Sequence, residues 1–325
     1  MTGPNGVGKT NLLEAVHVGS QGFSPRTRAD AEIIRFGCNQ GRIVLRGERS
    51  RTRVELEVRL ALARAKRAQV NGAALAAAEQ LRSEAAVLVF TPDRMVIVKG
   101  GPAARRSYFD RALGRFSPAR ATLPVEYAAA VGQRNAALRR AGAGLSSREA
   151  LDPWTARVAE LGAALVEARM ATLAALSAGF RRNGENLGLP AAELRYEGES
   201  PTAAELEERL ERDLERGTTG AGPHLHDFAI LSADRDLRRF GSQGEQRLAV
   251  LALILAEAEL VCERGDVPLL LLDDVLSELD DRRRAVLVER VRSLGQSLVT
   301  ATSRSALPGD PDQLVEVEPG LARTV

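Results

Sequence analysis

Residues 3–10 read Gly-Pro-Asn-Gly-Val-Gly-Lys-Thr, which matches the pattern GxxxxGK[ST] of a phosphate-binding loop. Glycines let backbone N–H groups surround phosphates, and the helix expected from Asn11 directs its positive end at them. In this pattern Lys9 reaches the β- and γ-phosphates, and the Thr10 hydroxyl binds Mg²⁺. A chance glycine-rich turn is the alternative, which the helical periodicity of residues 11–18 disfavours. We therefore expect ATP to contact Gly3, Pro4, Asn5, Gly6, Val7, Gly8, Lys9 and Thr10.

A second segment, Leu269-Leu-Leu-Leu-Asp273-Asp274, reads as a buried strand that ends in two carboxylates. Buried strands rarely end in paired acids unless a cation or a reacting water lies there. Asp273 is expected to hold Mg²⁺ through its water shell, and Asp274 to orient or deprotonate the attacking water. Lys9, Asp273 and Asp274 are the expected catalytic residues. The alternative is that the two acids merely begin a turn.

Two further motifs flank this strand. Residues 240–247, Phe-Gly-Ser-Gln-Gly-Glu-Gln-Arg, precede an apolar helix and resemble the signature motif of ABC ATPases. That resemblance implies that Ser242, Gln243, Gly244 and Gln246 contact ATP held by the opposite protomer. Residues 277–280, Ser-Glu-Leu-Asp, resemble the D-loop, which places Ser277 and Asp280 at a dimer interface. An ordinary glycine-rich helix start and a helix N-cap are the respective alternatives.

The chain has 325 residues, a length that suggests about two domains. Alternation at residues 54–60 predicts a strand, and Asn71-Gly72 predicts a hairpin turn. Residues 102–180 read as helices, and Thr202 with Glu205 predicts a capped helix through Arg216. Strands and helices then alternate at 248–261, 267–272, 281–293 and 297–301. We expect an α/β fold, an ABC-type P-loop ATPase head of mixed sheet and helices (1–98 and 218–325), with an inserted, mainly helical lobe (99–217).

The composition permits DNA binding only through a local patch, because the formal net charge is +2. Residues 99–150 contain ten basic and three acidic residues, a local charge of +7. The candidate phosphate contacts there are Arg105, Arg106, Arg134, Arg139 and Arg140, although a solvated helix surface is the alternative for any one of them. Two distant cysteines suggest neither zinc nor a disulfide framework. No apolar run approaches the roughly 18 to 20 residues of a membrane span, and the chain is expected to be cytoplasmic.

The order of these motifs, together with residues 90–110 and Gly222-Pro223-His224, resembles the RecF family over essentially the whole chain. The resemblance implies a cytoplasmic protein that binds ATP and Mg²⁺, forms an ATP-dependent homodimer and hydrolyses ATP slowly. It further implies binding to duplex or gapped DNA and help, with RecO and RecR, in loading RecA onto single strands.

Three departures from the family pattern qualify this resemblance. In the family a β-strand lies immediately upstream of the P-loop and an antiparallel strand lies before it, so about 25 to 30 residues are expected to be missing by the family pattern. Leu225 lies where the family carries an arginine, and Asp274 lies where most ABC ATPases have glutamate. The first departure leaves open a DNA-binding protein that is impaired as an ATPase. A transporter nucleotide-binding subunit, the other alternative, is disfavoured because no histidine lies near Thr302.

Overall fold

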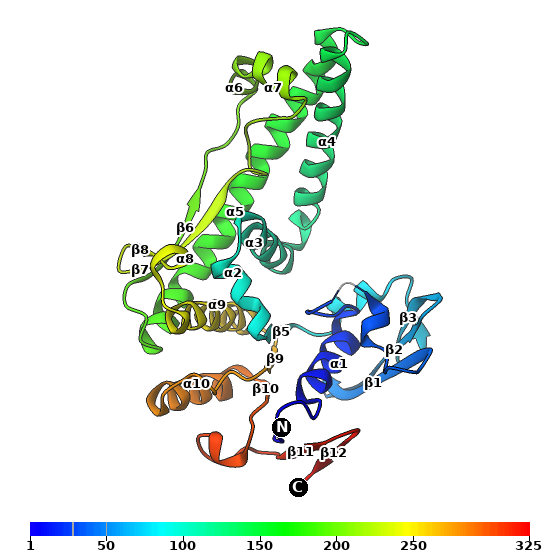
Figure 1. Cartoon of the computed structure of the whole chain (residues 1–325), viewed down its shortest axis with the longest axis vertical. Coiled ribbons are helices and arrows are strands. Elements are labelled where there is room, and N and C mark those ends of the chain that lie inside the picture. The colour runs from blue at the N-terminus through cyan, green and yellow to red at the C-terminus, as the bar shows by residue number, and fades with distance from the viewer. Residues whose placement is uncertain (28, 50) are drawn as a thin grey trace. The chain divides into compact units, whose positions relative to one another are not determined.

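The computed structural model describes residues 1–27, 29–49 and 51–325. The chain forms two compact units, which are described separately (Figure 1). Unit 1 comprises Met1–Met95, Asn186–Gly188 and Val250–Val325. Unit 2 comprises Val96–Glu185 and Leu189–Ala249.

The described helices and strands of the first 99 residues are α1 (Lys9–Gln21), β1 (Gln40–Arg49), β2 (Thr52–Ala61), β3 (Arg64–Val70), β4 (Ala73–Ala74), β5 (Val87–Phe90) and α2 (Val96–Lys99). The middle of the chain contains α3 (Pro102–Phe116), α4 (Leu123–Gly142), α5 (Asp152–Asn186), β6 (Ala192–Glu197), α6 (Ala203–Glu208), α7 (Leu210–Arg216), β7 (Asp227–Ser232), β8 (Arg235–Asp236) and α8 (Leu237–Phe240). The last part contains α9 (Gln243–Glu263), β9 (Leu269–Leu272), α10 (Asp281–Leu294), β10 (Gln296–Val299), β11 (Val315–Glu318) and β12 (Leu321–Thr324).

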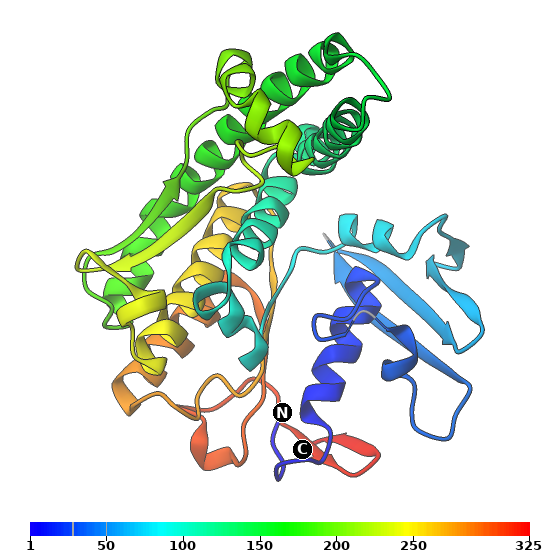
Figure 2. The ribbon, with the colours of Figure 1, turned by 45° about the horizontal axis from the view of Figure 1, so that its top comes forward.

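In unit 1, helix α1 packs against two sheets. The antiparallel sheet β1-β2-β3-β4 contributes alternate side chains of β2, among them Val58 and Leu60, to a core that includes Val18 of α1. The parallel sheet β10-β9-β5 forms a second core in which Leu13 of α1 meets Leu271 of β9. The predicted turn at Asn71-Gly72 is confirmed, since both residues have the positive φ of a type I′ hairpin. The first turn of α1 lies at the carboxyl end of β9, because Thr10 contacts Asp273, the residue that follows that strand. Figure 2 shows α1 beside the antiparallel sheet.

The first two residues of the chain extend this parallel arrangement. Thr2 bridges in parallel to Ala301, just past β10, and to Glu316 of β11. The Met1 ammonium donates to the Val299 carbonyl at 2.8 Å, and the Ala301 N–H donates to the Met1 carbonyl at 2.9 Å. Burial, and then the charge of Lys9, lower the pKa of this ammonium. The P-loop is therefore anchored directly at the end of a paired extended segment. Beside it, a cavity of about 500 Å³ runs along β10 and α10, with polar and apolar walls in nearly equal parts.

Unit 2 is built on the helices α3, α4 and α5, with the antiparallel sheet β6-β7-β8. Its core includes Leu113 of α3, Tyr127 of α4 and Val158 of α5. Phe109 stacks on Phe228 of β7 with ring centroids 4.1 Å apart, which joins the helices to the sheet. The apolar residues of α3 thus contact the neighbouring helices through Leu113 and the sheet through Phe109.

The expectation that no segment suits a membrane needs a correction. Among the described residues, the helical segment Arg148–Asn186 is long and apolar enough to cross a bilayer. Its side chains at Val158, Leu176 and Phe180 are completely buried in unit 2. We therefore interpret it as the central core helix of that unit.

The contact-based units differ from the predicted division of the chain. Residues 218–249 were expected in the ATPase lobe, but they belong to unit 2. They do so because β7 pairs with β6 and packs on α3. The other predicted boundary, between residues 98 and 99, lies three residues beyond the observed one at Met95.

Candidate nucleotide-binding site

The P-loop backbone is fixed by its glycines for two different reasons. A Cβ atom on Gly3 would lie 2.4 Å from the Val317 carbonyl oxygen, so only glycine permits this close approach to β11. Gly6 and Gly8 have φ values of 82° and 107°, which side chains rarely adopt, although a Cβ atom there would meet nothing. Gly8 is also the N-cap of α1, and no side chain caps that helix end. The first N–H groups of α1 are therefore available to an anion.

Lys9 lies over this loop. Its ammonium donates to the carbonyls of Gly3 at 2.6 Å and Pro4 at 2.8 Å. These bonds hold the positive charge above the backbone groups that would surround a phosphate.

Thr10 and Asp273, which are 263 residues apart in sequence, are in direct contact. The Thr10 hydroxyl donates to Asp273 Oδ2 at 2.8 Å, and the Asp273 N–H donates to the Phe90 carbonyl of β5 at 2.9 Å. Asp273 is 4% exposed, so its hydrogen bonds form with little competition from water. The structure thus joins the two residues that the sequence analysis assigned to Mg²⁺.

Thr300, at the end of β10, is the residue that the sequence analysis missed. Its hydroxyl donates to Asp273 Oδ1 at 2.8 Å and accepts the Asp274 N–H at 2.8 Å. The only sequence signal was a hydroxyl residue at the carboxyl end of a strand parallel to β9. Sequence spacing alone does not identify such a residue.

Asp274 adopts a left-handed conformation with a φ of 49°. Aspartate tolerates this region better than most residues, but the conformation needs support from its surroundings. Ser277 supplies part of it, since its hydroxyl lies 3.2 Å from the Asp274 carbonyl and 3.1 Å from Oδ2. Ser277 is exposed, so it is free to meet another molecule as well.

These groups fit a magnesium ion shared with a nucleotide. Mg²⁺ prefers oxygen ligands and is usually held by one or two protein groups plus phosphates and water. Thr10 and Asp273 offer such oxygens side by side. The described residues contain no cluster of three or more His, Cys, Asp or Glu side chains that could hold a metal alone.

The signature residues lie in unit 2 at the start of α9. The Ser242 N–H donates to Glu245 Oε2 at 2.8 Å, and the Glu245 N–H donates to the Ser242 hydroxyl at 3.2 Å, which is a reciprocal capping box. These bonds lower the pKa of the Glu245 carboxyl. Gln243 and Gly244 are exposed at the helix start. Gln246 is different: it is 5% exposed and its amide donates to the Leu237 carbonyl at 2.8 Å, so a nucleotide contact from its side chain is not supported.

Asp280 has a structural role in the chain itself. It is the N-cap of α10, and its carboxylate accepts the Arg283 N–H at 2.8 Å. This is the simpler alternative that the sequence left open. An additional role at a dimer interface stays a prediction.

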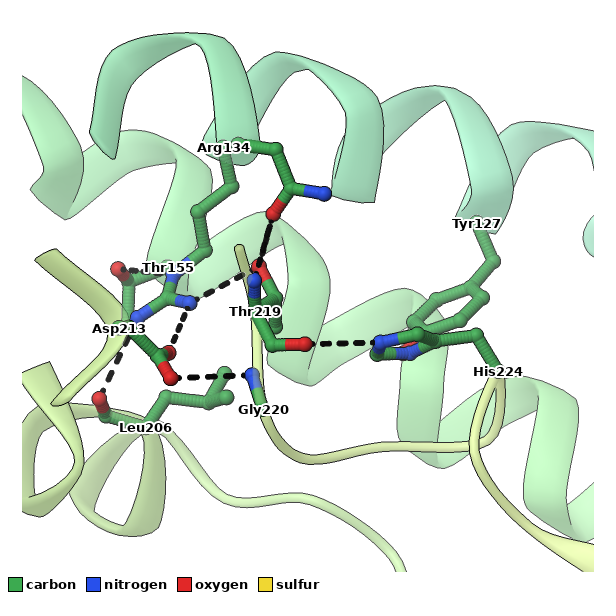
Figure 3. A network of polar contacts seen from close by, with 9 residues as sticks. Tyr127, Arg134, Thr155, Leu206, Asp213, Thr219, Gly220 and His224 are labelled. Atoms are coloured by element: carbon green, nitrogen blue, oxygen red, sulfur yellow. Dashed lines mark hydrogen bonds and ion pairs between the residues drawn. The ribbon is translucent and has the colours of Figure 1, made fainter. Parts of the chain in front are cut away.

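Arg134, a predicted DNA contact, is completely buried, and that prediction is wrong. Its guanidinium pairs with Asp213 at 2.7 Å and also donates to Thr155, Thr219 and the Leu206 carbonyl (Figure 3). A buried guanidinium with these partners cannot reach a DNA phosphate without unfolding the unit. The residue instead ties α4 to α5, to α7 and to the loop that follows α7.

Arg105 is likewise 2% exposed, so its predicted DNA contact is also wrong. It forms a bidentate pair with Asp227 at the start of β7, with both distances 2.7 Å. Arg106 is half-buried and donates to the His226 carbonyl. Arg139 and Arg140 remain exposed near the end of α4. These two, unlike Arg105 and Arg134, stay candidates for phosphate contacts.

The segment Gly222–Asp227 is held by the surrounding cations and tyrosines. Arg169 donates to the Pro223 carbonyl, and Tyr127 and Tyr196 bond to His224 and His226, each at 2.8 Å. Burial, followed by the charges of Arg169, His224 and Arg106, lowers the pKa of His226 to about 4. Leu225, where the family carries an arginine, is exposed.

A family model described as the RecF/RecN/SMC N terminal domain matches residues 1–320. Similar proteins include two called DNA replication and repair protein RecF. That of Ruminiclostridium cellulolyticum is 32% identical and covers 93% of this chain and 86% of its own length. That of Symbiobacterium thermophilum is 37% identical, with 92% and 84% covered. The chain belongs to the RecF family.

Solved RecF structures share this fold. The structure described as the recombination mediator protein RecF-ATP in the RecFOR pathway has a TM-score of 0.85 and 28% identity, and it covers 100% of this chain and 90% of that one. An Smc head bound to the winged-helix domain of ScpA has a TM-score of 0.57 at 17% identity, which shows the fold alone. The predicted fold class, an ABC-type ATPase head with an inserted helical lobe, is confirmed.

Proposed function

We propose that this RecF-family chain is a DNA replication and repair ATPase that binds Mg·ATP at the P-loop. The observation that carries the proposal is the 2.8 Å bond between Thr10 and Asp273. It joins the two residue types that hold a nucleotide's metal in P-loop proteins. The RecF relatives and the ATP-bound RecF structure named above support the same assignment.

Each residue of the proposed site has a separate task. The backbone N–H groups of residues 5–10 would surround the phosphates, and Lys9 would neutralise charge on the β- and γ-phosphates. Thr10 and Asp273 would hold Mg²⁺, which would supply charge stabilisation to the transferring phosphoryl group. Asp274 orients the attacking water or accepts its proton.

The active form is proposed to be an ATP-dependent homodimer. Ser242, Gln243 and Gly244 of one protomer would contact the γ-phosphate held by the other, because exposed N–H groups at a helix start attract anions. Ser277 and Asp280 would lie at the interface between the copies. Turnover would then be slow for an isolated protomer and faster for the assembled pair.

The DNA partner is proposed to be duplex or gapped DNA, bound through phosphates. Arg139 and Arg140 are the exposed members of the predicted set. The further role in a cytoplasmic repair pathway, helping RecO and RecR to load RecA, rests on membership of the RecF family alone.

The proposal is tested by thermal unfolding with and without Mg·ATP. A ligand that binds only the folded state at about 100 times its Kd stabilises by about 2.7 kcal/mol, roughly 5–10 °C in Tm for a domain of this size. We expect this shift for the parent chain and its loss for Lys9→Ala. Lys99→Ala, which removes an exposed lysine outside the P-loop, is the matched control. No shift for the parent, or an equal shift for Lys9→Ala, would contradict the assignment.

A further inference from the structure

We propose that Thr300 is the positioning residue of the acid pair: its hydroxyl sets the orientation of Asp273 for the metal and holds Asp274 in its left-handed conformation. This inference rests on the proposed function. Thr300 itself would touch neither metal nor nucleotide. It acts through the two aspartates.

Thr300 is built into the structure on every side. It is 1% exposed, and its N–H donates to the Leu272 carbonyl of β9 at 3.0 Å. The next residue, Ala301, donates to the Met1 carbonyl in the segment that leads to the P-loop. The backbone at Thr300 is therefore fixed between β9 and the start of the chain. The position of the hydroxyl is therefore set by the hydrogen-bonded backbone on both sides of it.

The hydroxyl's bonding capacity matches its surroundings. A threonine hydroxyl has one proton to donate and two lone pairs that accept. Thr300 gives its proton to Asp273 Oδ1 and accepts the Asp274 N–H, each at 2.8 Å. One side chain thus contacts both members of the acid pair.

The effect on Asp273 is to fix the plane of its carboxylate. Oδ1 accepts from Thr300, and Oδ2 accepts from Thr10. Because Thr10 donates its proton to Asp273, the lone pairs of its oxygen remain available to a cation. Without the Thr300 donor the carboxylate could rotate about its terminal bond, which is a broad torsion, and the contact with Thr10 would no longer be held.

The effect on Asp274 concerns the backbone. Its φ of 49° persists only when neighbouring groups hold it. Thr300 accepts its N–H, and Ser277 lies within hydrogen-bonding distance of its carbonyl and carboxylate. A continuous path of hydrogen bonds therefore runs from Thr10 of the P-loop through Asp273, Thr300 and Asp274 to Ser277.

The first arm of the test measures how much Mg²⁺ is needed to bind a fluorescent ATP analogue. Thr300→Val removes the hydroxyl and keeps the shape, and Thr300→Ser keeps the hydroxyl. Thr302→Val makes the same exchange at an exposed position two residues away. We expect the half-saturating Mg²⁺ concentration to rise roughly 10- to 100-fold for Thr300→Val, the range typical of residues that orient metal ligands. It should stay within about twofold for the other two variants.

The second arm needs no ligand. Hydrogen–deuterium exchange of the Asp274 amide, resolved by fragmentation mass spectrometry, should be at least about tenfold faster in Thr300→Val and unchanged in Thr302→Val, because only the first loses its acceptor. Unchanged exchange together with an unchanged Mg²⁺ midpoint in folded Thr300→Val would overturn the inference. A Thr300→Ser variant as weak as Thr300→Val would overturn it too. If the parent chain binds no Mg·nucleotide, the proposed function fails, and the exchange result alone decides whether Thr300 holds Asp274.

Discussion

Arg134 has the largest completely buried side chain in the described part of unit 2, and it carries a charge. Its partner Asp213 is also buried, with 2% of its side chain exposed. Desolvation makes such a pair costly to place in a core, but removing one member is costlier still, because the other charge is left alone. The pair therefore fixes the packing of α4 against the segment around α7, whatever its net contribution to stability.

Arg134→Ala is expected to lower the free energy of unfolding by about 3–5 kcal/mol, since Asp213 would keep a buried, unpaired charge. Chemical denaturation measures the change. Arg140→Ala, on the same helix but exposed, should stay within about 0.5 kcal/mol of the parent. A double variant, Arg134→Met with Asp213→Leu, should recover much of the loss. If Arg134→Ala were as stable as Arg140→Ala, the described network would be wrong.

For single residues, the sequence identifies the residue type but does not reveal whether the side chain is buried. Because residues 99–150 are basic, Arg105, Arg134 and Arg140 were all predicted to contact DNA phosphates. The aspartates that pair with Arg105 and Arg134 lie 122 and 79 residues away from them in sequence. No local pattern reports such distant pairs. By contrast, Lys9, Thr10 and Asp273 were predicted because their motifs are local and specific.

Helix α10 follows the acid pair, and its first turn depends on Asp280. The carboxylate accepts the Arg283 N–H, and the Arg283 side chain in turn donates to the Leu187 carbonyl beyond α5 at 3.0 Å. The Asp280 cap thus stabilises the first turn of α10, which contains Arg283 and its bond to Leu187. Arg283 thus connects the first turn of α10 to the residue that follows α5, within unit 1.

Asp280→Ala should cost about 1 kcal/mol of unfolding free energy, whereas Asp280→Asn should cost little, because asparagine caps as well as aspartate. Thermal unfolding of the isolated protomer without ATP measures the cap. ATP-dependent dimerisation of Asp280→Asn then reports any separate role of the charge. Equal stability of the alanine variant and the parent would argue against the cap.

The elements themselves were largely predictable where the periodicity was long. The predictions of a helix after the P-loop, an apolar helix after the signature, and the strand ending at Leu272 are confirmed. Strand β6 was missed, because its alternation covers only Ala192, Leu194 and Tyr196 within the predicted helical lobe. The predicted helix through Arg216 is two helices, interrupted at Arg209, whose ψ of −4° breaks the helical path. Thr300 was missed because its role exists only once β10 lies beside β9.

For the whole molecule, DNA binding is expected to depend on few exposed arginines. Arg140→Glu should weaken duplex binding several-fold, and the slope of log K against log salt should become shallower by about one. Binding measured at several salt concentrations tests both effects. Arg323→Glu, an exposed arginine of unit 1, is the charge-matched control. An unchanged affinity for Arg140→Glu, with the control also unchanged, would place the DNA surface elsewhere.

We propose that two copies of this chain form one working ATP site. This proposal is tested by steady-state ATP hydrolysis as a function of protein concentration, with and without gapped duplex DNA. We expect the rate per molecule to rise with concentration, because the P-loop of one protomer needs the signature residues of the other, and to rise further with DNA. A measurable rate per molecule that is constant across concentrations and indifferent to DNA would contradict it, since the site would then be complete in a single protomer.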